Sequence, residues 1–332
     1  MRAVTEPQPR TEKELLIASK AFTREDPLRA WAAVLSTFAL ISVLAIAIVA
    51  VPGWPPKAGL AAIQGLLLVR GFCLFHDFQH GSLLRGSPLA RAVFFLFGVL
   101  LLVPPSVWRE THNYHHAHTA QLVGSHIGSY PMLTPRMYLA LGPGQRWLYR
   151  AARHPLNIAG AMLSVFAVGM CLRPFLRAPL RHWQGLLSLL AGGTIAAAAI
   201  ATGHLEAFLF AWVLPLAIAT AAGGYLFYAQ HNFPGVKVAQ RESWTFTGAA
   251  LDSSSFMKMG PLMGWFTANI GFHHVHHLNA AIPFYRLPEA MAALSELQHP
   301  GTTTLTPRDI AACFRLKLWD PQSGRMVGYP AH

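Results

Sequence analysis

The strongest constraint on this chain is a set of four long apolar stretches. A helix that crosses the hydrocarbon core of a membrane needs about 20 consecutive, mostly apolar residues. Four stretches have roughly that length: residues 30–51, 58–75, 185–202 and 205–229. The whole chain agrees, because 53% of its residues are hydrophobic and only 12% are charged, a balance that soluble domains of this size seldom show. We therefore expect an all-α integral membrane protein with four transmembrane helices.

Two shorter apolar stretches, residues 92–104 and 156–172, are doubtful as membrane spans. Arginines flank each of them on both sides: Arg85, Arg91 and Arg109 around the first, and Arg146, Arg150, Arg153, Arg173, Arg177 and Arg181 around the second. Because Lys and Arg collect in cytoplasmic loops, both ends of each stretch are predicted to lie on the same side. We expect one or two helices that lie in the interface, with both chain termini in the cytoplasm.

The polar ends of the chain define three predicted regions. Residues 1–29 stay polar for longer than a cleavable signal peptide would, so they are expected to form a cytoplasmic tail. A membrane domain follows over residues 30–295, and residues 296–332 form a cytoplasmic C-terminal segment. The net charge of +12 lies outside the apolar stretches, which fits attraction to anionic lipid better than binding of nucleic acid. Three scattered cysteines predict neither a disulfide framework nor a cysteine metal site.

Histidines gather in four short motifs that the predicted topology places on the cytoplasmic side. They read "HDFQH" (76–80), "HNYHHAH" (112–118), "QHN" (230–232) and "HHVHH" (273–277). The first two motifs and the last bring the rings onto shared helix faces by i, i+3 and i+4 spacing: His76 and His80; His112, His115 and His116; His273, His276 and His277. His118 and His274 point away from these faces and are expected to support the site rather than to bind a metal.

With His231, nine imidazoles are available for metal binding. That number is too large for one tetrahedral or one octahedral ion, so the sequence predicts a cytoplasmic cap with a di-metal site. Imidazole suits zinc, copper, iron and nickel alike, and it binds only when deprotonated. Asp77, Asn113 and Asn232 adjoin the candidate ligands, and we expect them to orient the rings through hydrogen bonds.

Three classes of protein combine membrane helices with such residues. In a zinc protease, "HDFQH" would correspond to His-Glu-x-x-His with Asp77 as the general base, but six histidines would then have no role. A transporter would carry ionisable groups near the bilayer midplane, whereas these stretches are nearly free of them apart from Arg70. A membrane oxygenase with two irons and an apolar substrate fits best. Soluble di-iron bundles use two Glu-x-x-His motifs, and only Glu296 to His299, on a helix predicted to begin near Pro288, has that spacing.

The motifs "HDFQH", "HNYHH" and "HHVHH", with their surroundings "VRGFCLFHDFQHGSLL", "FYAQHNF" and "WFTANIGFHHVHHLNAAIPFYRLPEA", resemble those of the integral-membrane fatty acid desaturases. The similarity covers about residues 30–295 and is closest to bacterial and cyanobacterial acyl-lipid enzymes of the omega-6 type. It implies that nine histidines hold two iron ions: His76, His80, His112, His115, His116, His231, His273, His276 and His277. It also implies O2-dependent insertion of a double bond into a long acyl chain, carried by a lipid or an acyl carrier, in a bacterial inner membrane.

Two departures from the family pattern flank this predicted site. Phe78 and Gln79 stand where that branch commonly has Cys and Gly, and His118 and His126 are additional histidines. Related enzymes hydroxylate or ketolate apolar substrates with nearly the same motifs, so a membrane hydroxylase, ketolase or monooxygenase remains an alternative. The sequence has no dinucleotide, haem or iron–sulfur motif, so the electrons are expected from a separate ferredoxin or cytochrome b5 type protein.

Overall fold

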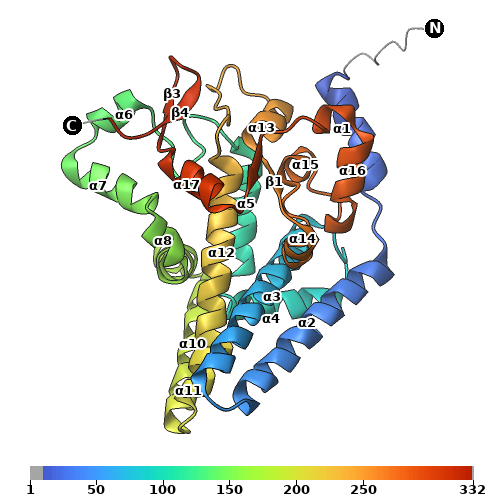
Figure 1. The fold of residues 1–332 in the computed structure, drawn as a ribbon, viewed down its shortest axis with the longest axis vertical. Coiled ribbons are helices and arrows are strands. Elements are labelled where there is room, and N and C mark those ends of the chain that lie inside the picture. The colour runs from blue at the N-terminus through green and yellow to red at the C-terminus, as the bar shows by residue number, and fades with distance from the viewer. Residues whose placement is uncertain (1–9, 331–332) are drawn as a thin grey trace.

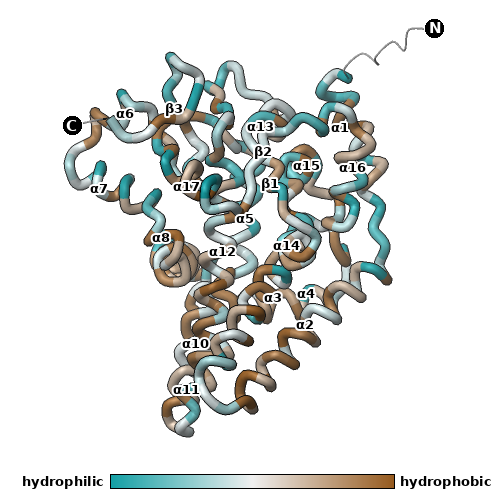
Figure 2. Tube along the Cα trace, viewed as in Figure 1, coloured by the Kyte–Doolittle hydropathy of each residue, from teal (hydrophilic) through white to brown (hydrophobic). Residues whose placement is uncertain are grey.

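Four long helices form the apolar half of the computed structural model, which describes residues 10–330 (Figure 1). They are α2 (Pro27–Ala50), α3 (Trp54–His80), α10 (Trp183–Ala201) and the helix Leu205–His231, which is made of α11 (Leu205–Phe208), η3 (Leu209–Val213) and α12 (Leu214–His231). Each is long and apolar enough to cross a membrane, so the prediction of four such helices is confirmed. Figure 2 shows the same division by hydropathy: apolar residues dominate these helices, and polar residues dominate the cap beyond their ends.

Helix α3 lies at the centre of the apolar half. In its most apolar window 56% of the residues are buried, against 17% to 22% in the other three spans. Gly65 explains how closely α12 approaches it, because a Cβ at this position would lie 2.7 Å from the side chain of Ile218. Small residues at such contacts let membrane helices pack backbone to backbone. The helix continues beyond the predicted span and ends at His80, so the "HDFQH" motif forms its last turns; Gly81, with a φ of +73°, is its C-cap.

The fourth span lacks one backbone hydrogen bond, and a side chain of α3 supplies a replacement. Pro215 has no backbone N–H to donate to the carbonyl of Ala211 four residues earlier, and the helix there adopts the π-helical turn η3. Gln64 Nε2 donates to that same carbonyl at 2.8 Å. A free carbonyl costs free energy where no water is available, so this contact explains why a polar side chain stands inside a span.

Arg70 is the one strongly basic residue deep in α3, and it is buried, with only 5% of its surface exposed. Its Nε donates to the hydroxyl of Thr37 in α2 at 3.0 Å, and its guanidinium also donates to the carbonyl of Trp265. The guanidinium carbon lies 4.2 Å from the centre of the Trp265 ring. Arg70 therefore joins α2 and α3 to helix α14 (Pro261–Phe266), which precedes the last histidine motif.

The two doubtful apolar stretches do not form straight crossings. The first lies in α4 (Pro88–Leu100), which is 13 residues long and bends by 90° into α5 (Pro105–His118); only together are the two long enough for a broken span. The second lies in α8 (Pro155–Ala159), the π-helical η2 (Met162–Leu172) and α9 (Arg173–Arg177). The helix that follows α8 is seen nearly end-on in Figure 1, so it runs across α12 rather than along it.

The cap is built from short elements. Its helices are α1 (Glu12–Ser19), η1 (Lys20–Phe22), α6 (Pro135–Ala140), α7 (Pro143–Ala152), α13 (Phe246–Ser253), α14, α15 (His273–Leu278), η4 (Phe284–Arg286), α16 (Leu287–Ala293), η5 (Ser295–Leu297) and α17 (Pro307–Arg315). Two sheets of two strands each accompany them: β1 (Phe256–Lys258) with β2 (Thr302–Thr304), parallel, and β3 (Leu318–Asp320) with β4 (Arg325–Val327), antiparallel. The fold is predominantly helical, as predicted; strands of three residues are too short to produce a recognisable alternation.

The ends of the described chain pack onto the cap. Residues 1–9 of the predicted tail and residues 331–332 lie outside the described part, but α1 and η1 place Leu15 and Phe22 in one buried cluster with Val275 and Leu278 of α15. The expected helix from Pro288 through His299 is wrong, since α16 ends at Ala293 and Glu296 lies in the separate turn η5. Glu296 instead forms an ion pair of 2.8 Å with Arg10.

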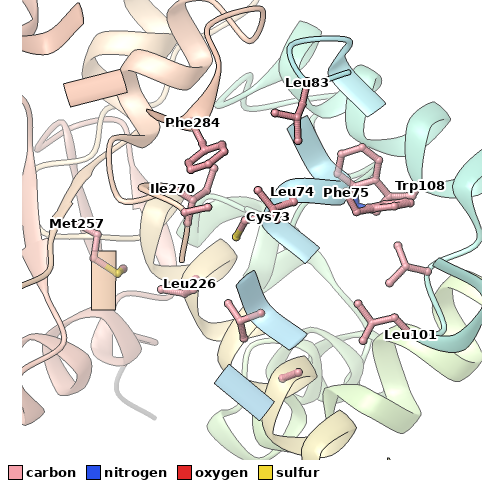
Figure 3. Close-up of a cluster of buried hydrophobic side chains, with 14 of the residues drawn as sticks. Cys73, Leu74, Phe75, Leu83, Leu101, Trp108, Leu226, Met257, Ile270 and Phe284 are labelled. Carbon is pink, nitrogen blue, oxygen red and sulfur yellow. The ribbon is translucent and has the colours of Figure 1, made fainter. Parts of the chain in front are cut away.

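A buried apolar cluster extends from the long helices into the cap (Figure 3). Leu74 and Phe75 of α3 are fully buried in it, and the Phe75 ring lies 5.5 Å from that of Trp108 in α5. Ile270 and Phe284 approach from the cap side, in the segments before and after α15. This cluster fixes α3, α5 and α15 against one another, and these helices carry eight of the nine histidines predicted to bind metal.

Candidate metal centre

The nine predicted histidines meet where α3, α5 and α12 enter the cap and α15 covers them. They form two groups, and the candidate ligand atoms of each group all lie within 4.8 Å of one another. The first group is His76, His80, His112, His116 and His276, and the second is His115, His231, His273 and His277. The structure thus brings together every residue that the sequence singled out as a candidate ligand.

Helices α5 and α15 each contribute to both groups, which the spacing alone did not predict. In α5, His112 and His116 join the first group while His115 joins the second. Successive residues turn by about 100°, so positions i+3 and i+4 lie on opposite sides of position i, about 100° apart. In α15 the assignment is reversed, because His276 joins the first group and its neighbours His273 and His277 join the second. Each triplet therefore bridges two adjacent positions for an ion.

The ring nitrogens of each group converge at short distances. In the first group, His112 Nε2 lies 3.1 Å from the Nε2 atoms of both His76 and His116, and the same distance separates His116 from His276. In the second group, the Nε2 contacts measure 3.1 Å for His115 with His231, 2.9 Å for His273 with His231, and 3.1 Å for His277 with His273.

These distances match those between ligands of one metal ion. Two nitrogens about 2.1 Å from the same ion are about 3.0 Å apart at an angle of about 90°, and about 3.4 Å apart at the tetrahedral angle. The observed contacts are as short as those between nitrogens that share one ion. Converging lone pairs repel one another unless a cation shares them, so the donor set fits metal ions.

Three groups hold histidine rings by their other nitrogen. Nδ1 of His76 donates to Asp77 Oδ1 at 3.2 Å, and Nδ1 of His231 donates to the carbonyl oxygen of Ser253 at 3.0 Å. Carboxylate and carbonyl oxygens only accept, so in both rings the lone pair is on Nε2 and faces the group. Nδ1 of His115 lies 2.6 Å from the hydroxyl of Ser129. The two serines were not predicted, since no spacing in the sequence connects them with the histidines.

The two histidines expected to support the site lie outside both groups. His274 is buried in α15, and its Nε2 donates to the carbonyl of Leu297 at 3.1 Å. His118 donates from Nδ1 to the carbonyl of Tyr114 at 2.9 Å, and the two rings stack with centroids 3.9 Å apart. His274 therefore attaches α15 to the C-terminal segment, while His118 stabilises the last turn of α5.

The two asparagines expected to orient rings do not contact the histidine groups. Asn232 donates to the carbonyl of Cys313 at 2.7 Å and accepts from Arg153, so it ties the end of α12 to α17. Asn113 is exposed on α5, and its side chain makes no hydrogen bond within the described part of the chain. Of the three expected polar neighbours, only Asp77 touches a candidate ligand.

Trp108 forms a wall of the first group that sequence reasoning missed. Its ring stacks on His112 with centroids 4.2 Å apart and meets His76 edge-on at 5.4 Å. It precedes His112 by one helical turn, and that spacing is the signal that would have identified it.

Burial keeps the rings of α15 neutral. Removal from water, followed by the proximity of other histidines, lowers the pKa of His273, His276 and His277 well below the usual value of 6.5. All three side chains are almost completely inaccessible, with 0% to 2% of their surface exposed. Neutral imidazole is the form that binds metal ions.

Comparison with known proteins decides the family. The sequence profile of the family described as fatty acid desaturase matches residues 52–307, more than half of the chain. The chain belongs to the fatty acid desaturase family. The predicted family is therefore confirmed, and with it the class of enzyme, an oxidoreductase of lipid metabolism.

The chain is similar in sequence to individual desaturases over most of their length. The chain is 32% identical over 275 residues to a fatty acid desaturase of Bacillus subtilis, covering 82% of this chain and 77% of that protein. It is 24% identical over 280 residues to an sn-1 oleoyl-lipid 12-desaturase of Picosynechococcus, covering 82% and 78% respectively. An sn-1 acyl-lipid omega-3 desaturase (ferredoxin) of Synechocystis is 24% identical over 256 residues, covering 71% of this chain and 66% of the relative.

Proposed function

We propose that this desaturase inserts a double bond into a long acyl chain with two iron ions, O2 and electrons from a separate protein. The reaction converts –CH2–CH2– to –CH=CH–, and the two hydrogen atoms removed from the chain form two water molecules together with one O2, two electrons and two protons. The observation that carries the proposal is the division of nine buried or half-buried histidines into two groups at the cap end of the apolar helices.

In this proposal, the first group holds one iron ion and the second group holds the other. Five imidazoles in the first group exceed the four ligands of a tetrahedral zinc ion, and nine imidazoles in two groups suit two ions. When bound, the iron pair supplies the redox chemistry that activates O2. The chain itself contributes the orientation of the rings by Asp77, Ser129 and the Ser253 carbonyl, and the apolar wall at Trp108 that excludes water.

A zinc protease fits the geometry less well. Its general base would be Asp77, but Oδ1 of this carboxylate accepts from His76 and Oδ2 accepts from the backbone N–H of Phe284 at 2.8 Å. Both oxygens are engaged and Asp77 is buried, so it is placed to orient a ring rather than to activate a water molecule. A hydroxylase or ketolase would use the same groups, and product analysis distinguishes it.

We further propose that both termini and the histidine groups face the cytoplasm of a bacterium, across its inner membrane. The arginine-rich segments around residues 85–109 and 146–181 support this orientation. An acidic ferredoxin would suit the net charge of +12, and one relative carries ferredoxin in its name. Reporter enzymes fused to each terminus test this orientation. If it is right, a reporter that is active only in the cytoplasm should be active at both termini.

Expression in a bacterium that lacks polyunsaturated lipids tests the reaction. We expect new double bonds in lipids from cells with the wild-type chain, located by mass spectrometry after derivatisation. His116→Ala should abolish the product, whereas His126→Ala, which removes an exposed histidine outside both groups, should not. A new hydroxyl or keto group would establish the alternative reaction, and unchanged lipids with an iron-loaded, membrane-inserted protein and an adequate electron supply would contradict the proposal.

A further inference from the structure

An open, basic cavity lies beside the first histidine group. It has a volume of about 650 Å³ and is formed where α3 ends, α4 begins and α5 passes beside them. Its lining includes His80, Gln79, Arg85, Arg91 and Arg109. His80 belongs to the first histidine group, so this cavity connects the solvent-exposed surface with the edge of the candidate metal centre.

The three arginines give the cavity an uncompensated positive charge. All three are exposed, and within residues 10–330 none forms an ion pair with a carboxylate. Glu110, the acidic neighbour of Arg109, pairs instead with Arg181 at 2.9 Å. The N-terminal end of α4, a helix of 13 residues, adds the positive end of its dipole next to Arg91.

Gln79 holds one of these guanidinium groups in place. Its Oε1 accepts from Nε of Arg109 at 3.0 Å and from a terminal nitrogen of the same group at 2.6 Å. A neutral acceptor fixes the position of Arg109 without cancelling its charge. Gln79 lies inside the first histidine motif, next to His80, and is one of the two residues that depart from the family pattern.

The size and position of the cavity indicate a small molecule from the membrane. A volume of several hundred Å³ is typical of small-molecule sites, whereas docking of a protein needs a broader surface of about 800 Å² on each partner. Leu89 and Leu96 of α4 are 62% and 58% exposed, as expected where a helix meets lipid. Leu89 and Arg91 both lie in the first four residues of α4, so an exposed apolar side chain and a basic side chain that lines the cavity are close neighbours on this helix.

We propose that this cavity binds the phosphate group of the acyl donor and thereby holds the acyl chain beside the histidine groups. The inference rests on the proposed desaturase function and names its substrate class: an acyl donor that carries a phosphate group. Arginine guanidinium groups bind phosphate oxygens through paired, charge-assisted hydrogen bonds. An acyl chain offers no charge of its own, so fixing its head determines which carbon atoms reach the metal centre.

Two sources of this chemistry exist, an anionic phospholipid and an acyl thioester of coenzyme A. Native mass spectrometry of the purified full-length chain in neutral detergent separates them, with dioleoylphosphatidylglycerol, dioleoylglycerol and oleoyl-CoA as probes. Dioleoylglycerol has the same acyl chains as the phospholipid but no phosphate. We expect one of the two phosphate-bearing probes to bind at least about tenfold more tightly than dioleoylglycerol, and the tighter of them identifies the source.

Two double variants test whether the arginines of the cavity cause the preference for phosphate-bearing probes. The double substitution Arg85→Gln with Arg91→Gln should lower affinity for the phosphate-bearing probe about tenfold and leave dioleoylglycerol binding unchanged. The control, Arg177→Gln with Arg308→Gln, removes the same charge from exposed positions outside the cavity and should retain wild-type affinity. Equal melting temperatures of the two variants would exclude a general loss of structure.

Three results would overturn the inference. The first is equal affinity of the wild-type chain for probes with and without phosphate. The second is an equal loss of affinity in both double variants. The third is that the Arg85→Gln, Arg91→Gln variant binds lipid like the wild type but accepts electrons more slowly from an acidic donor protein. The first comparison needs no variant, so it decides the matter even if a substitution disturbs folding. Because the readout is binding, failure here leaves new double bonds in the expression experiment unaffected, and the two proposals can fail separately.

Discussion

Asp77 and Phe284 lie 207 positions apart in the chain, and the backbone N–H of Phe284 donates to Oδ2 of Asp77 at 2.8 Å. The other oxygen of this buried carboxylate accepts from His76. One side chain thereby ties the first histidine motif, at the end of α3, to the segment that follows the third motif in α15. The position of α15 over the histidine groups and the orientation of the His76 ring depend on the same residue.

Asp77→Asn should weaken metal binding, because an amide offers one acceptor oxygen where the carboxylate offers two. Groups that orient metal-bound histidines typically change affinity about 10-fold to 100-fold when removed. Iron retained against increasing concentrations of a chelator measures the effect. Asp252→Asn, which removes an exposed carboxylate paired with Lys237, serves as the control and should bind iron like the wild type. Equal retention in both variants would show that Asp77 does not orient the ring.

Ser129→Ala should loosen the second histidine group selectively. Its hydroxyl lies 2.6 Å from Nδ1 of His115, and we expect metal affinity at that group to fall about tenfold without it. Ser125→Ala is a matched control in the same loop: Ser125 and Ser129 both line a small cavity beside His115, but Ser125 makes no hydrogen bond to a candidate ligand in the described part of the chain. At an intermediate chelator concentration, iron content should fall from two ions per chain toward one in Ser129→Ala alone.

Gln64→Leu should destabilise the protein because it leaves the Ala211 carbonyl without a donor inside the membrane. Hydrogen bonds between membrane helices contribute about 1 kcal/mol, so a loss of that order is expected in reversible unfolding from detergent micelles.

Pro215→Ala provides the test of this cause, since alanine restores the missing backbone N–H. A double-mutant cycle should then show that Gln64→Leu costs less in the Pro215→Ala background than in the wild type. An equal cost in both backgrounds would mean that Gln64 stabilises the helices through packing alone.

Acid should destabilise the metal-free protein and release metal from the loaded protein. Burial lowers the pKa of His273, His276 and His277 in the folded state, and lowers the pKa of His274 to about 4. The unfolded chain therefore binds more protons below about pH 6.5, so stability is present above that pH and is lost as the pH falls toward the folded-state values. Melting temperatures and iron content between pH 7.5 and 5 should fall together; a constant or rising melting temperature would contradict this assignment.

The sequence by itself determined the features that depend on local pattern. The thickness of a bilayer sets the length of a spanning helix, so four apolar stretches predicted α2, α3, α10 and the helix that ends at His231. The i, i+3 and i+4 spacing identified every candidate ligand in α3, α5 and α15, because helical periodicity places such residues together whatever surrounds them. Expectations that rested on adjacency alone were less successful: Asn113 and Asn232 adjoin histidines in the chain but do not contact either group.

Tertiary structure decided which histidines lie together in each group and which other residues contact them. His115 and His116 are neighbours in sequence but belong to different groups, because each ring turns toward a different helix, α12 for His115 and α15 for His116. Ser129 and Ser253 reach the rings from loops and helix ends, and Gln64 meets the carbonyl that Pro215 leaves free only because α3 packs on α12. Contacts between segments distant in the chain arise from the packing of whole helices, and no local periodicity encodes them.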